Sequence, residues 1–222
     1  MTPSHGLDEQ AGDRPLVAIY ADESCLGNGR EGSNPGGAAG VIEYGRPRSG
    51  TLTRWDYWVS EPATTNNRMA LRSAIEAFRG ISRKDRRFRV AFTSDSQYLV
   101  KGMSEWVFGW MTRGWKKKDG PILNLELWME AVDVVRGGGH QVSWHWVRGH
   151  EGHPQNEYAN FLATRAAREQ SQSNGIVASQ FNEWLAAERS KGRVHAEPQP
   201  FPDSSSFRAL RPYPAARPPT TI

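Results

Sequence analysis

Two aspartates stand where strand-like segments of the chain could bring their carboxylates together. Asp22 lies in an alternating run of apolar and polar residues at 16–24, and Asp95 closes a second such run at 87–95. Alternation of this kind predicts strands, and neighbouring strands would place both carboxylates at one site. Carboxylate oxygens are the ligands that Mg²⁺ prefers in proteins. Two carboxylates brought together in this way could hold a divalent cation, although an arbitrary aspartate is more often a surface turn residue.

The elements that must position these aspartates follow two different periodicities. Strands are expected at residues 16–24, 38–44, 51–60, 87–95 and 140–147. Helices are expected at 68–81, 125–135 and 154–170, with short helices broken at Gly102, Gly109 and Gly114 between residues 96 and 121. The last two strands are each reached through helical segments. This order favours an α/β fold with a five-stranded mixed sheet flanked by helices.

Length and composition restrict the class of protein. The chain has 222 residues, and its single cysteine, Cys25, excludes an internal disulfide framework. It contains no apolar run of the roughly 20 residues that cross a bilayer, and its polar N-terminus differs from a secretory signal. We therefore expect a cytoplasmic monomer without membrane association.

Composition also divides the chain into four segments. Residues 1–14 are expected to be a flexible leader, and residues 15–170 carry the periodic elements of one domain. Residues 171–196 are expected to form a linker and a short amphipathic helix, which could dock on this domain or on a partner, with the domain favoured. Residues 197–222 hold half of the 14 prolines, which predicts a disordered tail whose partner is unknown.

Positive charge is concentrated in the middle of the chain. Between Arg79 and Lys118 there are eleven Lys or Arg residues and three acids, a local excess of eight against +4 for the whole chain. A basic block of this kind favours an anionic partner such as nucleic acid. The alternative is a solvated surface without a partner.

Five motifs in register make the sequence similar to a known family. They are YADESCLGN at 20–28, TTNNRM at 64–69, TSDSQY at 93–98, WVFGWMTRGWKKK at 106–118 and WVRGHEGHPQNE at 146–157. Over about residues 16–169 the chain resembles the type 1 ribonuclease H family, which cleaves the RNA strand of RNA–DNA hybrids. The resemblance implies a ribonuclease H-like fold, here with a C-terminal extension.

The resemblance also implies roles for residues of the expected metal site. Asp22 corresponds to the acid that bridges two metal ions, and Asp95 corresponds to a second ligand. His150 matches a mobile histidine credited with assisting proton movement or product release. The implied cofactor is Mg²⁺, with Mn²⁺ as an alternative, because two divalent ions can activate water and stabilise the leaving 3′-oxygen.

The chain departs from the family pattern at three positions of this site. Ala70 stands where the family has its second acid, Asn160 where it has its fourth, and Glu23 where it has a glycine. Asn160 could still offer a neutral oxygen to a metal. Glu23 could replace a lost carboxylate, but strand alternation points it away from Asp22 unless the strand bulges or ends early. Glu151 and Glu157 are the other candidates.

Substrate recognition is expected to be better preserved than catalysis. Asparagines and a glutamine match positions that contact the minor groove of the hybrid, where 2′-hydroxyls distinguish RNA from DNA. Other residues match a phosphate site and a basic protrusion that grips the DNA backbone. Trp106 and Trp110 are expected to belong mainly to the core. The predicted substrate contacts are Asn28, Thr65, Asn66, Asn67, Arg68, Gln97, Trp115, Lys116, Lys117 and Lys118.

Three functions fit these observations. The first is metal-dependent hydrolysis of the RNA strand of RNA–DNA hybrids by an altered and weakened site. The second is a catalytically silent hybrid-binding module, in which Ala70 and Asn160 remove turnover. The third is another nuclease or recombinase of the wider fold, against which the basic protrusion and the GHEGHP loop at 149–154 argue.

Overall fold

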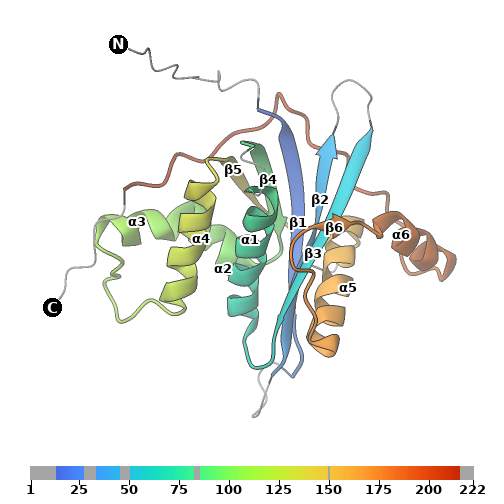
Figure 1. The fold of residues 1–222 in the computed structure, drawn as a ribbon, viewed down its shortest axis with the longest axis horizontal. Coiled ribbons are helices and arrows are strands. Elements are labelled where there is room, and N and C mark those ends of the chain that lie inside the picture. The colour runs from blue at the N-terminus through green and yellow to red at the C-terminus, as the bar shows by residue number, and fades with distance from the viewer. Residues whose placement is uncertain (1–13, 28–33, 46–50, 83–85, 150, 216–222) are drawn as a thin grey trace.

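The computed structural model describes residues 14–27, 34–45, 51–82, 86–149 and 151–215. Its centre is a single mixed sheet with the strand order β5-β4-β1-β2-β3-β6 (Figure 1). β1, β2 and β3 form an antiparallel meander, and β4 and β5 run parallel to β1. The strands are β1 (Leu16–Cys25), β2 (Gly36–Gly45), β3 (Leu52–Glu61), β4 (Arg89–Ser94), β5 (Gln141–Trp146) and β6 (Val177–Ala178).

The sheet has six strands in the described part of the chain, so the expectation of five is wrong. The additional strand, β6, comes from the C-terminal extension and pairs antiparallel with β3, where Trp55 faces Ala178 and Asp56 faces Val177. A two-residue strand is too short for alternation to reveal it in the sequence.

Helices cover both faces of the sheet, in the arrangement that Figure 1 shows. The main core lies between the sheet and α1, α4 and the segment from α2 to α3, and a smaller core lies under α5 and α6. The helical elements are α1 (Asn66–Ser82), α2 (Gln97–Lys101), the π-helical turn η1 (Gly102–Trp106), α3 (Val107–Thr112), α4 (Leu125–Gly137), α5 (Pro154–Glu169) and α6 (Phe181–Ser190). None of the helices in the described ranges is long and apolar enough to cross a bilayer.

Strand alternation in β1 assigns its side chains to these two cores. Ile19 and Ala21 belong to the main core on the α1 face, whereas Ala18 and Tyr20 belong to the core on the α5 face. Because side chains alternate along a strand, the side chain of Asp22 leaves β1 on the α5 face and the side chain of Glu23 leaves it on the α1 face.

Two of the three expected helix breaks are absent. Gly102 lies within the continuous path from α2 through η1, and Gly109 lies inside α3. Gly102 is needed for packing, because a side chain there would collide with the ring of Trp128. Only Gly114, with φ of +66°, follows the end of a helix, as a C-terminal glycine commonly does.

The C-terminal extension packs on the domain. Phe181 of α6 is fully buried, with its ring centroid 5.4 Å from that of Tyr158 on α5. Asp56 of β3 accepts hydrogen bonds from the Tyr158 hydroxyl (2.6 Å) and from the backbone N–H of Gln180 (3.1 Å). The docking expected for the short helix is therefore observed.

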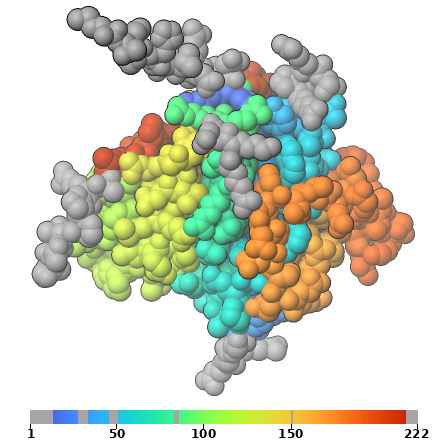
Figure 2. Space-filling view, viewed as in Figure 1, coloured from blue at the N-terminus to red at the C-terminus, as the bar shows by residue number. Residues whose placement is uncertain are grey.

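The Pro-rich segment also lies against the domain, where its composition predicts disorder. Residues 197–215 run as a chain largely without regular secondary structure, and Leu210 N–H donates to the carbonyl of Val142 at 2.7 Å. Figure 2 shows α6 and the last described residues on opposite sides of the molecule. Contacts such as that of Leu210 hold this segment against the domain, although its composition favours disorder. Residues 1–13 of the leader expected at 1–14 and residues 216–222 lie outside the described residues, and the division of the chain into four segments stays a prediction.

Candidate active site

Three carboxylates meet where β1 and β4 diverge. Asp22, Glu23 and Asp95 each offer a carboxylate oxygen, and these oxygens all lie within 4.8 Å of one another. The β1–β4 ladder ends at the pair Ala21–Ser94. The next residue of each strand, Asp22 and Asp95, therefore lies just beyond the last pair. The structure thus brings together the two aspartates of the predicted metal site.

Glu23 joins the cluster without the bulge or early strand end that alternation demands. The β1–β2 register continues unbroken to the pair Cys25–Gly36. It is the neighbouring strand β4 that ends, at Ser94, so among the described residues no strand pairs with β1 beside Glu23 on that side. Ala70 of α1 is fully buried in the same core cluster as Ala21. A methyl group at position 70 is therefore compatible with a glutamate that arrives from the strand.

The electrostatics of the cluster favour a cation. Burial, reinforced by the charge of Asp95, raises the pKa of Asp22 well above its usual value. Burial and the charges of Asp22 and Asp95 also raise the pKa of Glu23, and a hydrogen bond with Ser96 opposes this only partly. Oε2 of Glu23 is buried and has no hydrogen-bond partner among the described residues. An oxygen-only donor set with an orphaned buried oxygen fits a hard divalent ion such as Mg²⁺.

Asn156 on the first turn of α5 holds Asp22, and sequence reasoning missed this residue. Its Nδ2 donates to Oδ2 of Asp22 at 3.0 Å, and both side chains are buried. The backbone N–H of Glu23 donates to the other oxygen, Oδ1, at 2.6 Å. The sequence feature that could have identified Asn156 is its place in the GHEGHPQNE motif, one turn before Asn160 on the same helical face.

The fourth expected site residue, Asn160, is half-buried on α5. Its Oδ1 accepts a 3.4 Å hydrogen bond from the hydroxyl of Thr164. Glu157, one of the alternative acids, lies close enough for its charge to raise the pKa of Asp22. Glu151, the other alternative, is half-exposed and pairs with Arg148 at 3.2 Å.

The backbone carbonyl of Asp95 accepts a hydrogen bond, and its carboxylate lies against the backbone of the loop at Gly149. The indole Nε1 of Trp146 donates to the carbonyl of Asp95 at 2.9 Å. A side chain at Gly149 would displace the carboxylate of Asp95, so the glycine lets the backbone of this loop lie against that carboxylate. His150, the next residue, lies outside the described residues, and its expected role stays a prediction.

A statistical model of the family named RNase H matches residues 14–168. The chain belongs to the RNase H family. A ribonuclease H of Chromohalobacter salexigens is 43% identical over 170 residues, covering 76% of this chain and 92% of that protein. A ribonuclease H of Cupriavidus metallidurans is 44% identical over 150 residues, covering 67% of this chain and 93% of that protein.

A solved RNase H structure is similar over more of the chain. It is described as LC9-RNase H1, a type 1 RNase H with the type 2 active-site motif. It is 59% identical, has a TM-score of 0.83, and covers 92% of this chain and 98% of its own. The resemblance to the type 1 RNase H family that the motifs indicated is thus confirmed.

The predicted RNase H substrate contacts at the start of α1 follow Thr64, whose carbonyl accepts a 3.4 Å hydrogen bond from Sγ of Cys25, two residues after Glu23. Thr65 and Asn67 are exposed, and Asn66 has a buried Oδ1 without a hydrogen-bond partner in the described chain. Arg68, the expected phosphate ligand, pairs with Glu126 at 2.8 Å, an exposed ion pair that a phosphate could displace at small cost. Gln97 is exposed at the start of α2, and Asn28 lies outside the described residues.

In the basic protrusion of this RNase H, at residues 106–118, the lysines are exposed whereas the tryptophans pack inward. Lys116, Lys117 and Lys118 are exposed. Trp115, predicted to contact substrate, is instead 6% exposed and packs in the main core, and its backbone adopts a φ of +59°. Trp106 and Trp110 pack against that core, as expected. The buried Trp115 therefore anchors the loop that presents the lysines.

Proposed function

We propose that this protein hydrolyses the RNA strand of RNA–DNA hybrids with a three-carboxylate site in which Glu23 replaces the acid missing at Ala70. The observation that carries the proposal is the convergence of one carboxylate oxygen each from Asp22, Glu23 and Asp95 within 4.8 Å, with a buried glutamate oxygen that has no hydrogen-bond partner in the described part of the chain. The solved relative described as having a type 2 active-site motif supports an altered donor set in a type 1 protein.

Each residue of the site has a distinct task in this reaction. Bound divalent ions would supply the activation of water and the stabilisation of the leaving 3′-oxygen. Asp22, Glu23 and Asp95 would hold these ions, with Mg²⁺ as the proposed cofactor and Mn²⁺ as the alternative. Asn156 keeps the Asp22 carboxylate oriented through its 3.0 Å hydrogen bond. Asn160 would add a neutral oxygen, without the charge of the family's fourth acid.

The surface beside the site supplies the substrate contacts. Ser96, which precedes Gln97, hydrogen-bonds Glu23, and Thr64, which precedes Thr65, accepts a hydrogen bond from Cys25. We assign Gln97 and the start of α1 to the minor groove of the hybrid, where RNA and DNA differ in their 2′-hydroxyls. The exposed lysines 116–118 would contact phosphates. His150 would assist proton movement or product release.

Cleavage of a labelled RNA–DNA hybrid, with Mg²⁺ and separately with Mn²⁺, tests this proposal. We expect metal-dependent products from the RNA strand alone, no cleavage of matched DNA duplex, and no activity in the variant Asp22→Asn. Binding of the hybrid should be measured beside cleavage. Tight binding without cleavage in either metal would refute the proposal and establish the silent hybrid-binding function instead.

A further inference from the structure

The C-terminal segment makes a polar clamp on the first turn of α5. The side chain of Gln155 and the backbone of Gln199 exchange two hydrogen bonds of 2.9 Å, from Gln199 N to Gln155 Oε1 and from Gln155 Nε2 to Gln199 O. The side-chain Nε2 of Gln199 lies 2.8 Å from Nδ1 of His153. Gln155 is 1% exposed, so this amide pair is shielded from water on its helical side.

The turn that is clamped needs an external partner. The N-cap residue of α5 is His153, which makes no capping hydrogen bond from its own side chain. A helix terminus without a side-chain cap tends to open locally. The contacts from Gln199 link His153 and Gln155, the residues on either side of Pro154, and thereby fasten this turn to the rest of the protein.

The clamped turn carries the group that orients Asp22. Asn156 follows Gln155 directly and donates the 3.0 Å hydrogen bond to Oδ2 of Asp22. Opening of the turn would withdraw this donor from a buried carboxylate at the centre of the proposed metal site. Such supporting residues around metal ligands typically change metal affinity or activity by about 10- to 100-fold when removed.

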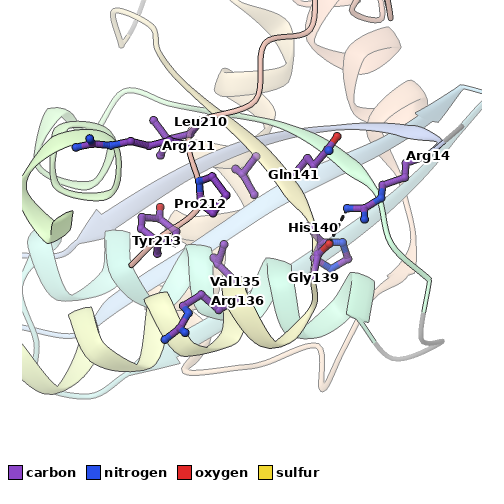
Figure 3. Close-up of a pocket in the computed structure, with 11 residues that line it drawn as sticks. Arg14, Val135, Arg136, Gly139, His140, Gln141, Leu210, Arg211, Pro212 and Tyr213 are labelled. Atoms are coloured by element: carbon purple, nitrogen blue, oxygen red, sulfur yellow. Dashed lines mark hydrogen bonds between the residues drawn. The ribbon is translucent and has the colours of Figure 1, made fainter. Parts of the chain in front are cut away.

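The C-terminal segment also contacts the domain before and after Gln199. Before it, α6 packs on α5 through Phe181. After it, Tyr213 donates to the carbonyl of Met103 at 2.9 Å and accepts from Nε1 of Trp144 at 3.2 Å. Figure 3 shows residues 210–213 lining one side of a cavity of about 420 Å³, with Val135, Arg136 and Gly139–Gln141 on the other side. The far anchor is therefore on β5 and η1 and does not involve α5.

We propose that Gln199 and Gln155 are positioning residues, through which the C-terminal segment holds the first turn of α5 and thereby sets the affinity of the site for divalent metal. The kinetic consequence rests on the function proposed above, whereas metal binding and helix opening do not require cleavage. Because the clamp acts through Asn156 and one step removed from Asp22, we expect a smaller effect than for a direct partner, about 3- to 10-fold.

The test compares three variants of the full chain with a matched truncation. Gln199→Ala removes the contact with His153, Gln155→Leu removes the amide pair, and truncation after Glu197 removes the whole clamp. Truncation after Arg208 removes the far anchor at Leu210 and Tyr213 and leaves the clamp. Mg²⁺ binding is measured by calorimetry on metal-free protein, helix opening by hydrogen exchange of residues 151–158, and folding by thermal unfolding.

The clamp variants should bind Mg²⁺ about 3- to 10-fold more weakly and exchange the first-turn amides faster, with the largest effect in the truncation after Glu197. Their cleavage should need more Mg²⁺, with an unchanged KM for the hybrid. The truncation after Arg208 should lower the melting temperature and leave Mg²⁺ affinity unchanged.

Equal loss of Mg²⁺ affinity in the Arg208 truncation would show a general stability effect and overturn the inference. Unchanged Mg²⁺ binding and exchange in Gln155→Leu and in the Glu197 truncation would overturn it as well. If the natural protein binds Mg²⁺ but cuts no hybrid, the proposed function fails while the clamp is still tested by binding and exchange.

Discussion

The substitution Glu23→Gln tests the altered site most directly, because it removes one charge and almost no volume. At about 4 Å and an effective dielectric constant of about 20, two unit charges interact by about 4 kcal/mol, and a divalent ion doubles this. The cost of desolvating the carboxylate offsets a large part of that attraction. We expect a net loss of about 3 to 4 kcal/mol of ion and transition-state stabilisation, which corresponds to about a 100- to 1000-fold slower cleavage at about 1.4 kcal/mol per tenfold.

The assay is single-turnover cleavage of a labelled hybrid over a series of Mg²⁺ concentrations. Glu151→Gln is the matched control, since Glu151 is an acid of the neighbouring loop that pairs with Arg148 and lies outside the cluster. Misfolding is excluded by thermal unfolding without metal. In that measurement Glu23→Gln should be at least as stable as the natural protein. Burial raises the pKa of Glu23, so the charged form of Glu23 opposes folding. A variant that keeps more than about a third of the natural rate would refute the role of Glu23.

An exchange of positions tests the geometric part of the same reasoning. Glu23→Gly with Ala70→Glu restores the family arrangement and should recover much of the activity that Glu23→Gly loses. Ala70→Glu alone should destabilise the fold by about 1 to 3 kcal/mol, because position 70 is fully buried and its neighbourhood is already filled. Additive losses in the double variant would show that the two positions do not share one space.

Three further predictions concern the rest of the site. Asn160→Asp should strengthen Mg²⁺ binding in calorimetry and speed cleavage if the missing charge weakens the site; an unchanged rate would show that it does not. Replacing Lys116–Lys118 with alanine should reduce the salt dependence of hybrid binding by about one log–log unit for each phosphate that these lysines neutralise, whereas the exposed Lys191→Ala should not. Burial raises the pKa of Asp22 in the folded state, so its charge costs stability as pH rises above the unfolded pKa. Asp22→Asn should therefore stabilise metal-free protein at pH 8, and this gain should shrink toward pH 4; a gain that does not depend on pH would contradict the assignment.

Local patterns predicted the elements that carry the site. Alternation located the five long strands, and the cluster at Thr64–Asn67 located the start of α1. The convergence of Asp22 and Asp95 followed as well, because Asp22 lies within one expected strand and Asp95 at the end of another, and neighbouring strands bring such positions together. Motifs spread over about 150 residues identified the family for the same reason, since each marks a fixed place in one fold.

Local sequence patterns do not predict contacts between distant segments of the chain. Glu23 reaches the cluster because the neighbouring strand ends at Ser94, a property of β4 rather than of β1. Trp115 turns into the core through a backbone angle that side-chain chemistry does not favour. A glycine reads as a helix break in sequence, yet Gly102 is required by the ring of Trp128 from another helix.

By itself, the sequence determined the family, the order of the main strands and helices, and the two aspartates at the centre of the site. Only the tertiary structure decided which third carboxylate completes the cluster, that Asn156 holds Asp22, and that a segment of disorder-prone composition lies on the domain and clamps α5. The physical reason is the range of the interactions. Periodicity reports which face of an element is buried, whereas a strand's neighbour, an amide pair 44 residues apart and a docked tail depend on how separate elements meet.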